Sequence, residues 1–163
     1  MDRTAIKKLP LSIGNLKRLV HLDAQHCPIV ELPAAIGGLT ALQRLTINHS
    51  LLETLPNEIA NLSFLEKLDA HMCNIHTLPA NFGALANLTH CSFANNELHS
   101  LPPSIGALHK LKHLNLRNNK LTTLPENIKY LRNLKTLILS GNPIPESEQK
   151  KIQEWLPKLS IRF

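Results

Sequence analysis

The sequence predicts an α/β solenoid, a right-handed horseshoe whose short strands form one parallel sheet on the concave side. Two observations predict it: a 23-residue repeat along the chain, and an apolar pattern of period two inside each repeat. Six Leu-Pro pairs mark the repeat, namely Leu9-Pro10, Leu32-Pro33, Leu55-Pro56, Leu78-Pro79, Leu101-Pro102 and Leu124-Pro125. Because one such unit cannot bury its apolar face alone, we expect neighbouring units to stack and share a core.

Each repeat contains a segment of the pattern L-x-x-L-x-L-x-x-N-x-L, whose positions we number 1 to 11. The six segments start at Leu19, Leu42, Leu65, Leu88, Leu111 and Leu134. Apolar side chains at positions 4 and 6 are flanked by more polar ones at positions 3, 5 and 7, which indicates a strand with one buried face. Positions 3, 5, 7 and 8 therefore belong to the concave side. The Leu-Pro segments return on the convex side as short helical or 3-10 turns, because proline suits a first turn.

Position 9 is a buried position that calls for a polar side chain able to bond to turn backbone. Its occupants form a predicted structural ladder of Cys27, Ser50, Cys73, Asn96, Asn119 and Asn142. An asparagine has both a donor and an acceptor for this task, whereas serine and cysteine offer less. We therefore expect the N-terminal half of the solenoid to be looser than the C-terminal half.

The repeats account for most of a single domain over residues 1–163. About six repeats occupy 9–144, and a C-terminal helical cap over 145–163 is expected to cover the end of the core. The apolar side chains suited to this cover are Ile152, Trp155, Leu156 and Leu159. No capping helix precedes the first repeat, so we expect the N-terminal cap to be absent and the first strand edge to be open. An open edge invites pairing with another chain.

The composition of the chain bears on its cellular compartment and on the classes of partner it can bind. The start of the chain, Met1 to Lys8, lacks the apolar core of a signal peptide, and three cysteines without CxxC spacing fit a reducing compartment. We therefore expect a cytoplasmic protein. No stretch of 18 apolar residues occurs, so no membrane span is expected. The net charge of +6 divides into +4 for residues 1–18, −5 for 19–109 and +7 for 110–163, which differs from a uniform nucleic-acid stripe.

The sequence contains no sign of an enzyme, a cofactor or a metal site. Phosphate-loop, zinc-protease and serine-hydrolase motifs are all missing. Cys91 and His90 are neighbours, but successive strand residues point to opposite faces, and Cys91 takes a leucine position. It is expected to be a buried core thiol.

Histidine is the unusual component, with nine residues in the chain. Six fall on the concave side by register, at His21, His26, His49, His71, His90 and His113. Adjacent strands lie about 4.8 Å apart, so His90 and His113 could face each other, as could His26 and His49. Such pairs leave open a metal site or a pH-sensitive face. Since no third ligand is evident, we expect a scattered polar surface without bound metal.

The repeats resemble leucine-rich repeats of the class with 23-residue L-P-x-x-I-G-x-L units, found in Ras-group-related and bacterial intracellular proteins. The tail from Asn142-Pro143 through Trp155-Leu156-Pro157 to Ile161-Arg162-Phe163 resembles the C-terminal caps of bacterial members. The resemblance covers about residues 6–163. It implies a binding scaffold, since members of this class mostly bind proteins and some bacterial ones are delivered into host cells.

We therefore predict a non-catalytic module that binds a partner protein, of a kind the sequence does not identify, on its concave face. The expected binding residues are His21, Asp23, Arg44, Thr46, Asn48, Lys67, Asp69, His71, Met72, His90, His113, Asn115 and Arg117. Chemically mixed side chains on this face suit a protein surface. A monomer is expected. Two alternatives stay open: a structural element that pairs with a second copy through the N-terminal edge, and the repeat portion of a bacterial effector.

Overall fold

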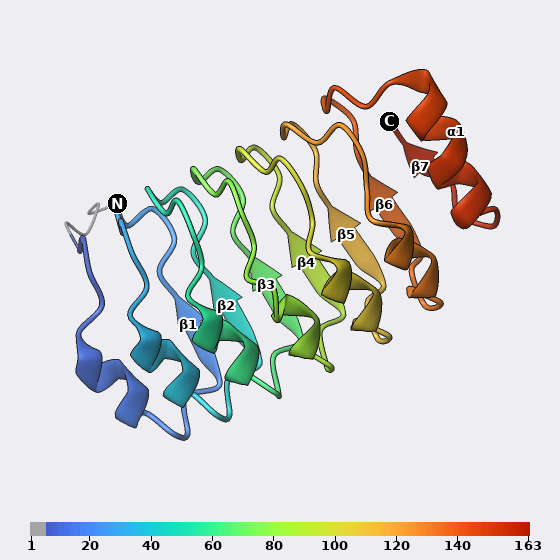
Figure 1. Ribbon diagram of the computed structural model, residues 1–163. Coiled ribbons are helices and arrows are strands. Elements are labelled where there is room, and N and C mark those ends of the chain that lie inside the picture. Colours follow the sequence, from blue (N-terminus) through green and yellow to red (C-terminus); the bar gives the residue numbers. More distant parts are fainter. Residues whose placement is uncertain (1–5) are drawn as a thin grey trace.

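The computed structural model describes residues 6–163 and has the predicted solenoid architecture (Figure 1). Seven short strands form one parallel sheet in chain order. They are β1 (His21–Asp23), β2 (Arg44–Thr46), β3 (Lys67–Asp69), β4 (His90–Ser92), β5 (His113–Asn115), β6 (Thr136–Ile138) and β7 (Ile161–Arg162). From β1 to β6 each residue pairs with the residue 23 positions later, so that His21 pairs with Arg44 and Arg44 with Lys67. The prediction of a parallel sheet is confirmed.

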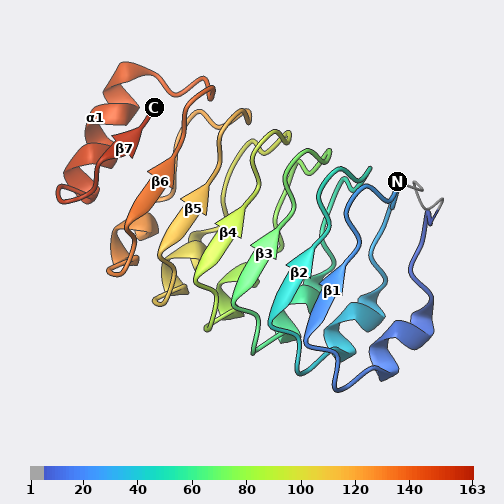
Figure 2. The same cartoon turned by 180° about the vertical axis from the view of Figure 1, so that it is seen from behind.

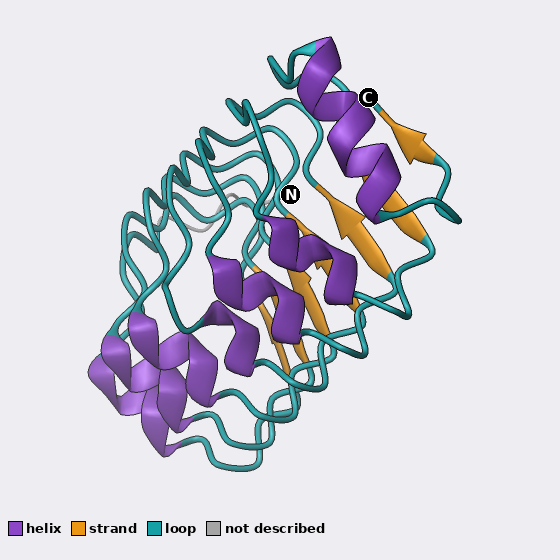
Figure 3. Ribbon diagram, turned by 45° about the vertical axis from the view of Figure 1, so that its right-hand side comes forward, coloured by secondary structure: helices purple, strands orange, loops and turns teal. Residues whose placement is uncertain are grey.

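Short 3-10 helices form the layer opposite the strands, as Figure 3 shows. They are η1 (Leu11–Asn15), η2 (Ala34–Gly38), η3 (Asn57–Asn61), η4 (Phe82–Ala84), η5 (Pro103–Ala107) and η6 (Glu126–Tyr130). All except η4 begin directly after the proline of the Leu-Pro pair, whose φ lies between −68° and −65°. The ring of proline therefore sets the backbone for the turn that follows.

Neighbouring convex turns approach so closely that glycine is required between them. A Cβ on Gly14 would lie 2.5 Å from the carbonyl oxygen of Ala35, and a Cβ on Gly83 would lie 1.9 Å from that of Ser104. No side-chain carbon tolerates such distances, so only the absence of a Cβ allows this spacing. The repeats can then stack with a constant pitch on the convex side.

The core lies between the sheet and the convex turns and is mainly aliphatic. Leucines at positions 1 and 4 of the central repeats are almost completely buried, namely Leu42, Leu45, Leu65, Leu68, Leu88, Leu111, Leu114 and Leu137. Phe82 and Phe93 add an aromatic contact, with ring centroids 5.8 Å apart. Cys91 fills its leucine position as a buried thiol. Stacking of repeats thus produces one continuous core from separate short segments.

The turn after each strand is joined to the preceding repeats through position 9. The side-chain oxygen of Asn96 accepts a hydrogen bond from the backbone of Ile75 at 2.9 Å, and its amide donates to the carbonyls of Ala70 and Phe93 at 2.8 and 3.0 Å. Asn119 and Asn142 make the same set of three bonds one and two repeats later. Each asparagine therefore ties together backbone from successive repeats.

Cysteine and serine bind the turn less completely in the N-terminal repeats. The thiol of Cys73 lies 3.4 Å from the carbonyl oxygen of Ile47, and its sulfur lies 3.1 Å from the hydroxyl of Ser50. A thiol has one weakly polar hydrogen and a weak acceptor, whereas an asparagine amide has two strong donors and a strong acceptor. Cys73 thus joins its rung to its neighbours through weaker side-chain bonds than the asparagines do.

Position 8 adopts a left-handed backbone in every repeat. The φ values are 57° for His26, 56° for His49 and 54° for Met72, followed by 56° for Asn95 and 52° for Asn118. Asparagine tolerates this conformation better than histidine or methionine, and glycine, as in the last repeat at Gly141, adopts it without strain. The N-terminal half therefore carries backbone strain that the C-terminal half avoids.

The two ends of the core differ in cover. At the C-terminal end, helix α1 (Glu146–Trp155) and the segment after it place Ile152, Leu156 and Leu159 against the core, each at most 8% exposed. At the other end Leu16 is 49% exposed, although the equivalent Leu39 is fully buried. The expectations for Met1 to Ala5 lie outside the described residues.

We predict that replacing Met72 with asparagine stabilises the protein. Asn relieves the cost of a left-handed conformation for methionine, about 1 kcal/mol, and Met72 is exposed, so little packing is lost. The midpoint of urea unfolding should rise. The reverse change, Asn95→Met, should lower it by at least as much, because it also removes the hydrogen bond that Asn118 donates to the Asn95 side chain. Unchanged midpoints in both variants would show that the turn conformation carries no strain.

A second prediction concerns local opening. Backbone amides between Leu22 and Ile29 should exchange with solvent faster than those between Leu114 and Leu121, because the N-terminal rungs lack the asparagine bonds. Hydrogen exchange measured by NMR or mass spectrometry checks this. Equal or slower exchange in the N-terminal segment would contradict it.

Candidate protein-binding face

The concave face is formed by the side chains that the strands turn away from the core. Figure 2 looks at the strands, which lie side by side from β1 to β7. Position 3 forms one row across them, made of His21, Arg44, Lys67, His90, His113 and Thr136. Position 5 forms a second row, made of Asp23, Thr46, Asp69, Ser92, Asn115 and Ile138. These side chains are exposed or half-buried, so they are accessible to a partner.

The second row orders the turns that follow it. Carboxylate or amide oxygens of Asp23, Asp69 and Asn115 accept hydrogen bonds from the backbone two residues later, at 3.1, 3.3 and 3.1 Å. Such local bonds are typical of Asp and Asn before a turn. The polar surface is therefore held in a defined shape before any partner arrives.

Three histidines meet at the end of β1 to β3. The rings of His26 and His49 are stacked with centroids 4.2 Å apart, and His71 meets His49 edge-on at 5.2 Å. Burial, together with the neighbouring His26 and His71, lowers the pKa of His49, while Asp69 acts in the opposite direction. His49 is thus held in its neutral form more strongly than an isolated histidine.

Asp69 is the centre of a hydrogen-bond cluster beside these rings. One carboxylate oxygen lies 2.7 Å from Nδ1 of His71, and the other accepts a bond from the side-chain amide of Asn48 at 3.3 Å. Asn48 is only 5% exposed, and its Oδ1 is buried without a hydrogen-bond partner. The structure therefore places Asn48, which the sequence assigned to the partner-binding surface, in the interior, where it positions Asp69.

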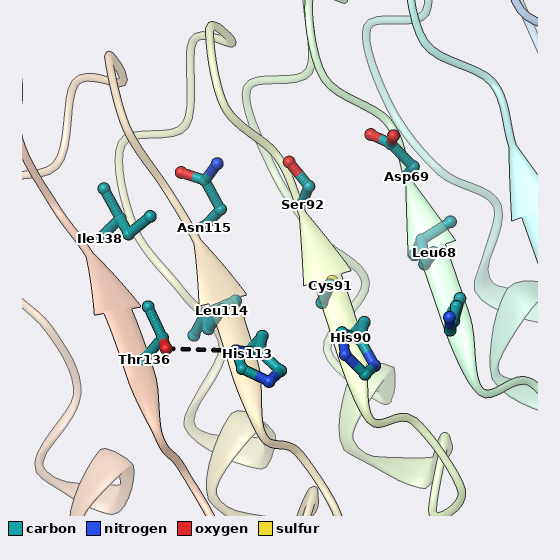
Figure 4. A pocket seen from close by; sticks show the side chains of 11 residues that line it. Leu68, Asp69, His90, Cys91, Ser92, His113, Leu114, Asn115, Thr136 and Ile138 are labelled. Atoms are coloured by element: carbon teal, nitrogen blue, oxygen red, sulfur yellow. Dashed lines mark hydrogen bonds between the residues drawn. The ribbon is translucent and has the colours of Figure 1, made fainter.

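A hollow of about 320 Å³ lies on the concave side across β3 to β6, and we name it the β4 hollow (Figure 4). Its lining consists of Lys67, Leu68, Asp69, His90, Cys91, Ser92, His113, Leu114, Asn115, Thr136 and Ile138. Ser92 on β4 is smaller than Asp69 and Asn115, its partners on either side. The small side chain in the middle therefore explains the depression.

A second histidine pair lines the β4 hollow. The rings of His90 and His113 are stacked with centroids 4.6 Å apart. Nδ1 of His90 lies 2.9 Å from the hydroxyl of Thr89, and Nδ1 of His113 lies 3.1 Å from that of Thr136. The expectation that His90 and His113 face each other is confirmed, as is that for His26 and His49.

The hydroxyl of Thr89 decides which nitrogen of neutral His90 carries the hydrogen. This hydroxyl donates its single hydrogen to the carbonyl of Glu66 at 2.9 Å, so it can only accept from His90. Nδ1 of His90 is therefore protonated, and Nε2 of the neutral ring is a free acceptor. Burial lowers the pKa of His90, and the adjacent His113, Lys67 and Lys112 lower it further.

Cys73 and Cys91 are poorly suited to act as nucleophiles. Burial raises the pKa of the Cys91 thiol far above its ordinary value, and burial also raises that of Cys73. Both thiols stay protonated near neutral pH, and a protonated thiol is a poor nucleophile and a poor metal ligand. Within residues 6–163, no group of three or more histidine, cysteine or acidic side chains is arranged to hold a metal ion.

The structure separates the sequence-predicted residues into groups. Five of them line the β4 hollow: Lys67, Asp69, His90, His113 and Asn115. Others lie on β1 and β2 outside it, namely His21, Asp23, Arg44 and Thr46. His71 belongs to the Asp69 cluster, and Met72 and Arg117 are exposed in the turns after β3 and β5. Sequence reasoning missed Ser92, Thr136 and Ile138, although the repeat register puts them in the same two rows.

Family models match two parts of the chain. A leucine-rich-repeat model covers residues 86–144, and a second leucine-rich-repeat model covers 133–159. A comparison with curated proteins gives no match. Leucine-rich repeats generally form protein–protein interaction modules without catalytic activity.

Solved structures extend the likeness to almost the whole chain. A leucine-rich-repeat protein of Leptospira interrogans is 40% identical over 99% of this chain and 41% of its own, with a TM-score of 0.93. An internalin from Listeria monocytogenes is 22% identical, with 96% and 46% covered and a TM-score of 0.80, and shows the fold alone. The plant peptide hormone receptor RGFR1, in complex with RGF2, is 28% identical, with 83% and 26% covered and a TM-score of 0.72.

The protein is a leucine-rich-repeat solenoid with a bacterial relative. The chain spans less than half the length of each of these three structures. None of the helices in residues 6–163 is long and apolar enough to cross a membrane.

The histidine stacks predict that the protein loses stability in mild acid. In the folded state the pKa values of His49 and His90 lie below the ordinary 6.5, so the unfolded chain binds more protons as pH falls. The histidine contribution is fully present above 6.5 and is lost as pH falls through the lower folded values. Urea midpoints at stepwise pH values test this. The double variant H49Q/H90Q should show a shallower decline between pH 7 and 5, and an unchanged decline would contradict the assignment.

Proposed function

We propose that this protein is a non-catalytic interaction module that binds a partner protein on its concave face. The observation that carries the proposal is the contrast between the two sides of each strand. Positions 4 and 6 are almost uniformly aliphatic and buried, whereas positions 3 and 5 differ from repeat to repeat in charge and size. Stacking constrains the first set, and a mixed polar surface with a hollow suits recognition of another protein.

The comparisons support the coarser part of this proposal. Leucine-rich repeats generally serve as protein interaction modules, and the structure of the plant receptor RGFR1 contains RGF2. The proposed partner-binding residues are those expected from the sequence without the buried Asn48, namely His21, Asp23, Arg44, Thr46, Lys67, Asp69, His71, Met72, His90, His113, Asn115 and Arg117. Residence in the cytoplasm belongs to the same proposal, because Cys27, Cys73 and Cys91 are all buried thiols.

A second candidate function is self-association through the N-terminal edge. Leu16 and Val20 are 49% and 38% exposed next to β1, and within residues 6–163 this strand has a strand partner on one side only. Burial of these side chains against a second copy would remove apolar surface from water. Light scattering over a range of concentrations separates the two functions, since a strict monomer excludes this one. A role as the repeat portion of a longer bacterial effector is compatible with either.

A combined substitution tests the concave assignment. Alanine at Arg44, Lys67, Asp69 and His90 should weaken binding of an identified partner at least about tenfold, because charged and ring contacts are lost together. Proximity labelling in cells identifies the partner, and calorimetry with purified proteins measures the affinity.

The matched control changes the same residue types outside the concave rows. Alanine at His109, Arg132, Lys158 and Glu154 should alter the affinity by less than about twofold. Circular dichroism confirms that both variants fold. If the concave variant binds like the original while the control variant does not, the binding surface lies elsewhere.

A further inference from the structure

The β4 hollow contains a cation that lacks an anionic partner. Within residues 6–163, Lys67 makes no ion pair, although it lines the hollow. The Asp69 carboxylate on the same strand makes no ion pair with it, because this carboxylate accepts bonds from the ring and backbone of His71 and from the amide of Asn48. The positive charge of Lys67 is therefore available to a ligand.

The histidine pair adds groups that become donors when protonated. Each ring uses Nδ1 for a threonine hydroxyl, so Nε2 of His90 and of His113 is the nitrogen left for a ligand. On the neutral ring of His90 this nitrogen is an acceptor, as the hydroxyl of Thr89 dictates. After protonation it carries a hydrogen and a share of positive charge.

Charges on the neighbouring elements favour an anionic ligand. Beside β4, the strand β3 contributes Lys67 and the carboxylate of Asp69, with Glu66 directly before it, and the β5 segment contributes His113 and Lys112. Lys135 precedes β6, and Arg162 on β7 pairs with Ile138, which lines the hollow. The cations of these segments thus outnumber the carboxylates, and the lining itself holds one of each, Lys67 and Asp69.

We propose that the β4 hollow binds a carboxylate side chain within an acidic segment of the partner, and that this binding takes up a proton on the His90–His113 pair. The inference rests on the proposed function and gives it a partner chemistry. Lys67 supplies the permanent charge, and Asn115, Ser92 and Thr136 supply neutral polar contacts. Ile138 covers the apolar stem of the acidic side chain.

Proton uptake follows from the same arrangement. Without a ligand, burial and the nearby cations keep His90 neutral at pH 7. A bound carboxylate reverses the local charge and favours the imidazolium form, because an opposite charge raises the pKa of a histidine. Affinity therefore increases as pH falls from neutrality toward about 5.5, while the carboxylate, with an ordinary pKa near 4.3, remains ionised.

A labelled oligoglutamate peptide is the probe for this test. Fluorescence anisotropy should show binding that is about fivefold tighter at pH 5.5 than at pH 7.5, and an oligolysine peptide should not bind. Calorimetry in two buffers of different ionisation enthalpy should show uptake of protons at pH 7. Tighter binding at higher pH, or no proton uptake, would overturn the proposal.

Matched variants locate the binding site. Lys67→Ala should weaken oligoglutamate binding about fivefold, whereas Lys158→Ala, outside the concave rows, should leave it unchanged. His90→Gln should remove most of the pH dependence, whereas His109→Gln, also outside the concave rows, should not. Equal effects of each variant and its control would show a diffuse attraction without a site. Lys67→Gln repeats the test with a side chain closer in size.

The outcomes separate this inference from the proposed function. If the concave variant abolishes partner binding but oligoglutamate does not compete with the partner, the acidic-segment inference fails and the concave function stands. If oligoglutamate binds in the hollow but partner binding survives the concave variant, the proposed function fails. Stronger competition by a single-stranded oligonucleotide than by oligoglutamate would overturn the assignment to a protein carboxylate.

Discussion

The structure depends on hydrogen bonds that join the turn after each strand to the repeats before it. Asn96, Asn119 and Asn142 each satisfy one backbone donor and two backbone acceptors that lie within the core region. Buried backbone groups without partners cost free energy comparable to a lost hydrogen bond, so the ladder stabilises the common register of successive repeats. Strand pairing, core packing and the concave rows all follow from that register.

The residue at position 9 differs between the two halves of the solenoid: it is cysteine or serine in the first three repeats and asparagine in the last three. In the N-terminal repeats a thiol or hydroxyl replaces the amide, and histidine or methionine adopts the left-handed turn that asparagine or glycine adopts later. The same repeats carry the His26, His49 and His71 rings and the Asp69 cluster on their concave side. In a repeat protein, local stability varies along the chain because each repeat contacts only its neighbours. The ladder therefore predicts that the frame of the concave surface is stiffer toward its C-terminal end.

Because adjacent strands from β1 to β6 pair with a shift of one repeat, residues 23 positions apart lie next to each other. The histidines are an example. Two equal side chains 23 residues apart meet on adjacent strands, as His90 and His113 do. Burial and the adjacent His113 lower the pKa of His90, because a second positive charge beside another imidazole is unfavourable. The repeat architecture thereby brings His90 and His113, which come from two different repeats, into direct ring contact.

Much of the candidate site follows from the repeat register alone. Counting in steps of 23 places Lys67, His90 and His113 in one row and predicts their contact, because parallel strands in register bring equivalent positions together. The same count places Ser92, Thr136 and Ile138 in the two rows, although the expected binding residues did not include them. Asn48 shows the limit of the method: its position faces the concave side, but its amide turns inward to Asp69 and is buried.

The sequence by itself determined the solenoid, the parallel register, the convex turns and the identity of the two concave rows. These features depend on periodicity and on the backbone preferences of proline, glycine and asparagine, which are local properties of the chain. Only the tertiary structure decided that a small Ser92 between Asp69 and Asn115 leaves a hollow, and that Thr89 holds His90 with Nε2 free. The hollow depends on the relative sizes of side chains from several repeats, and the tautomer of His90 depends on a hydrogen bond from Thr89 to another repeat. The pattern within a single repeat therefore does not reveal either feature.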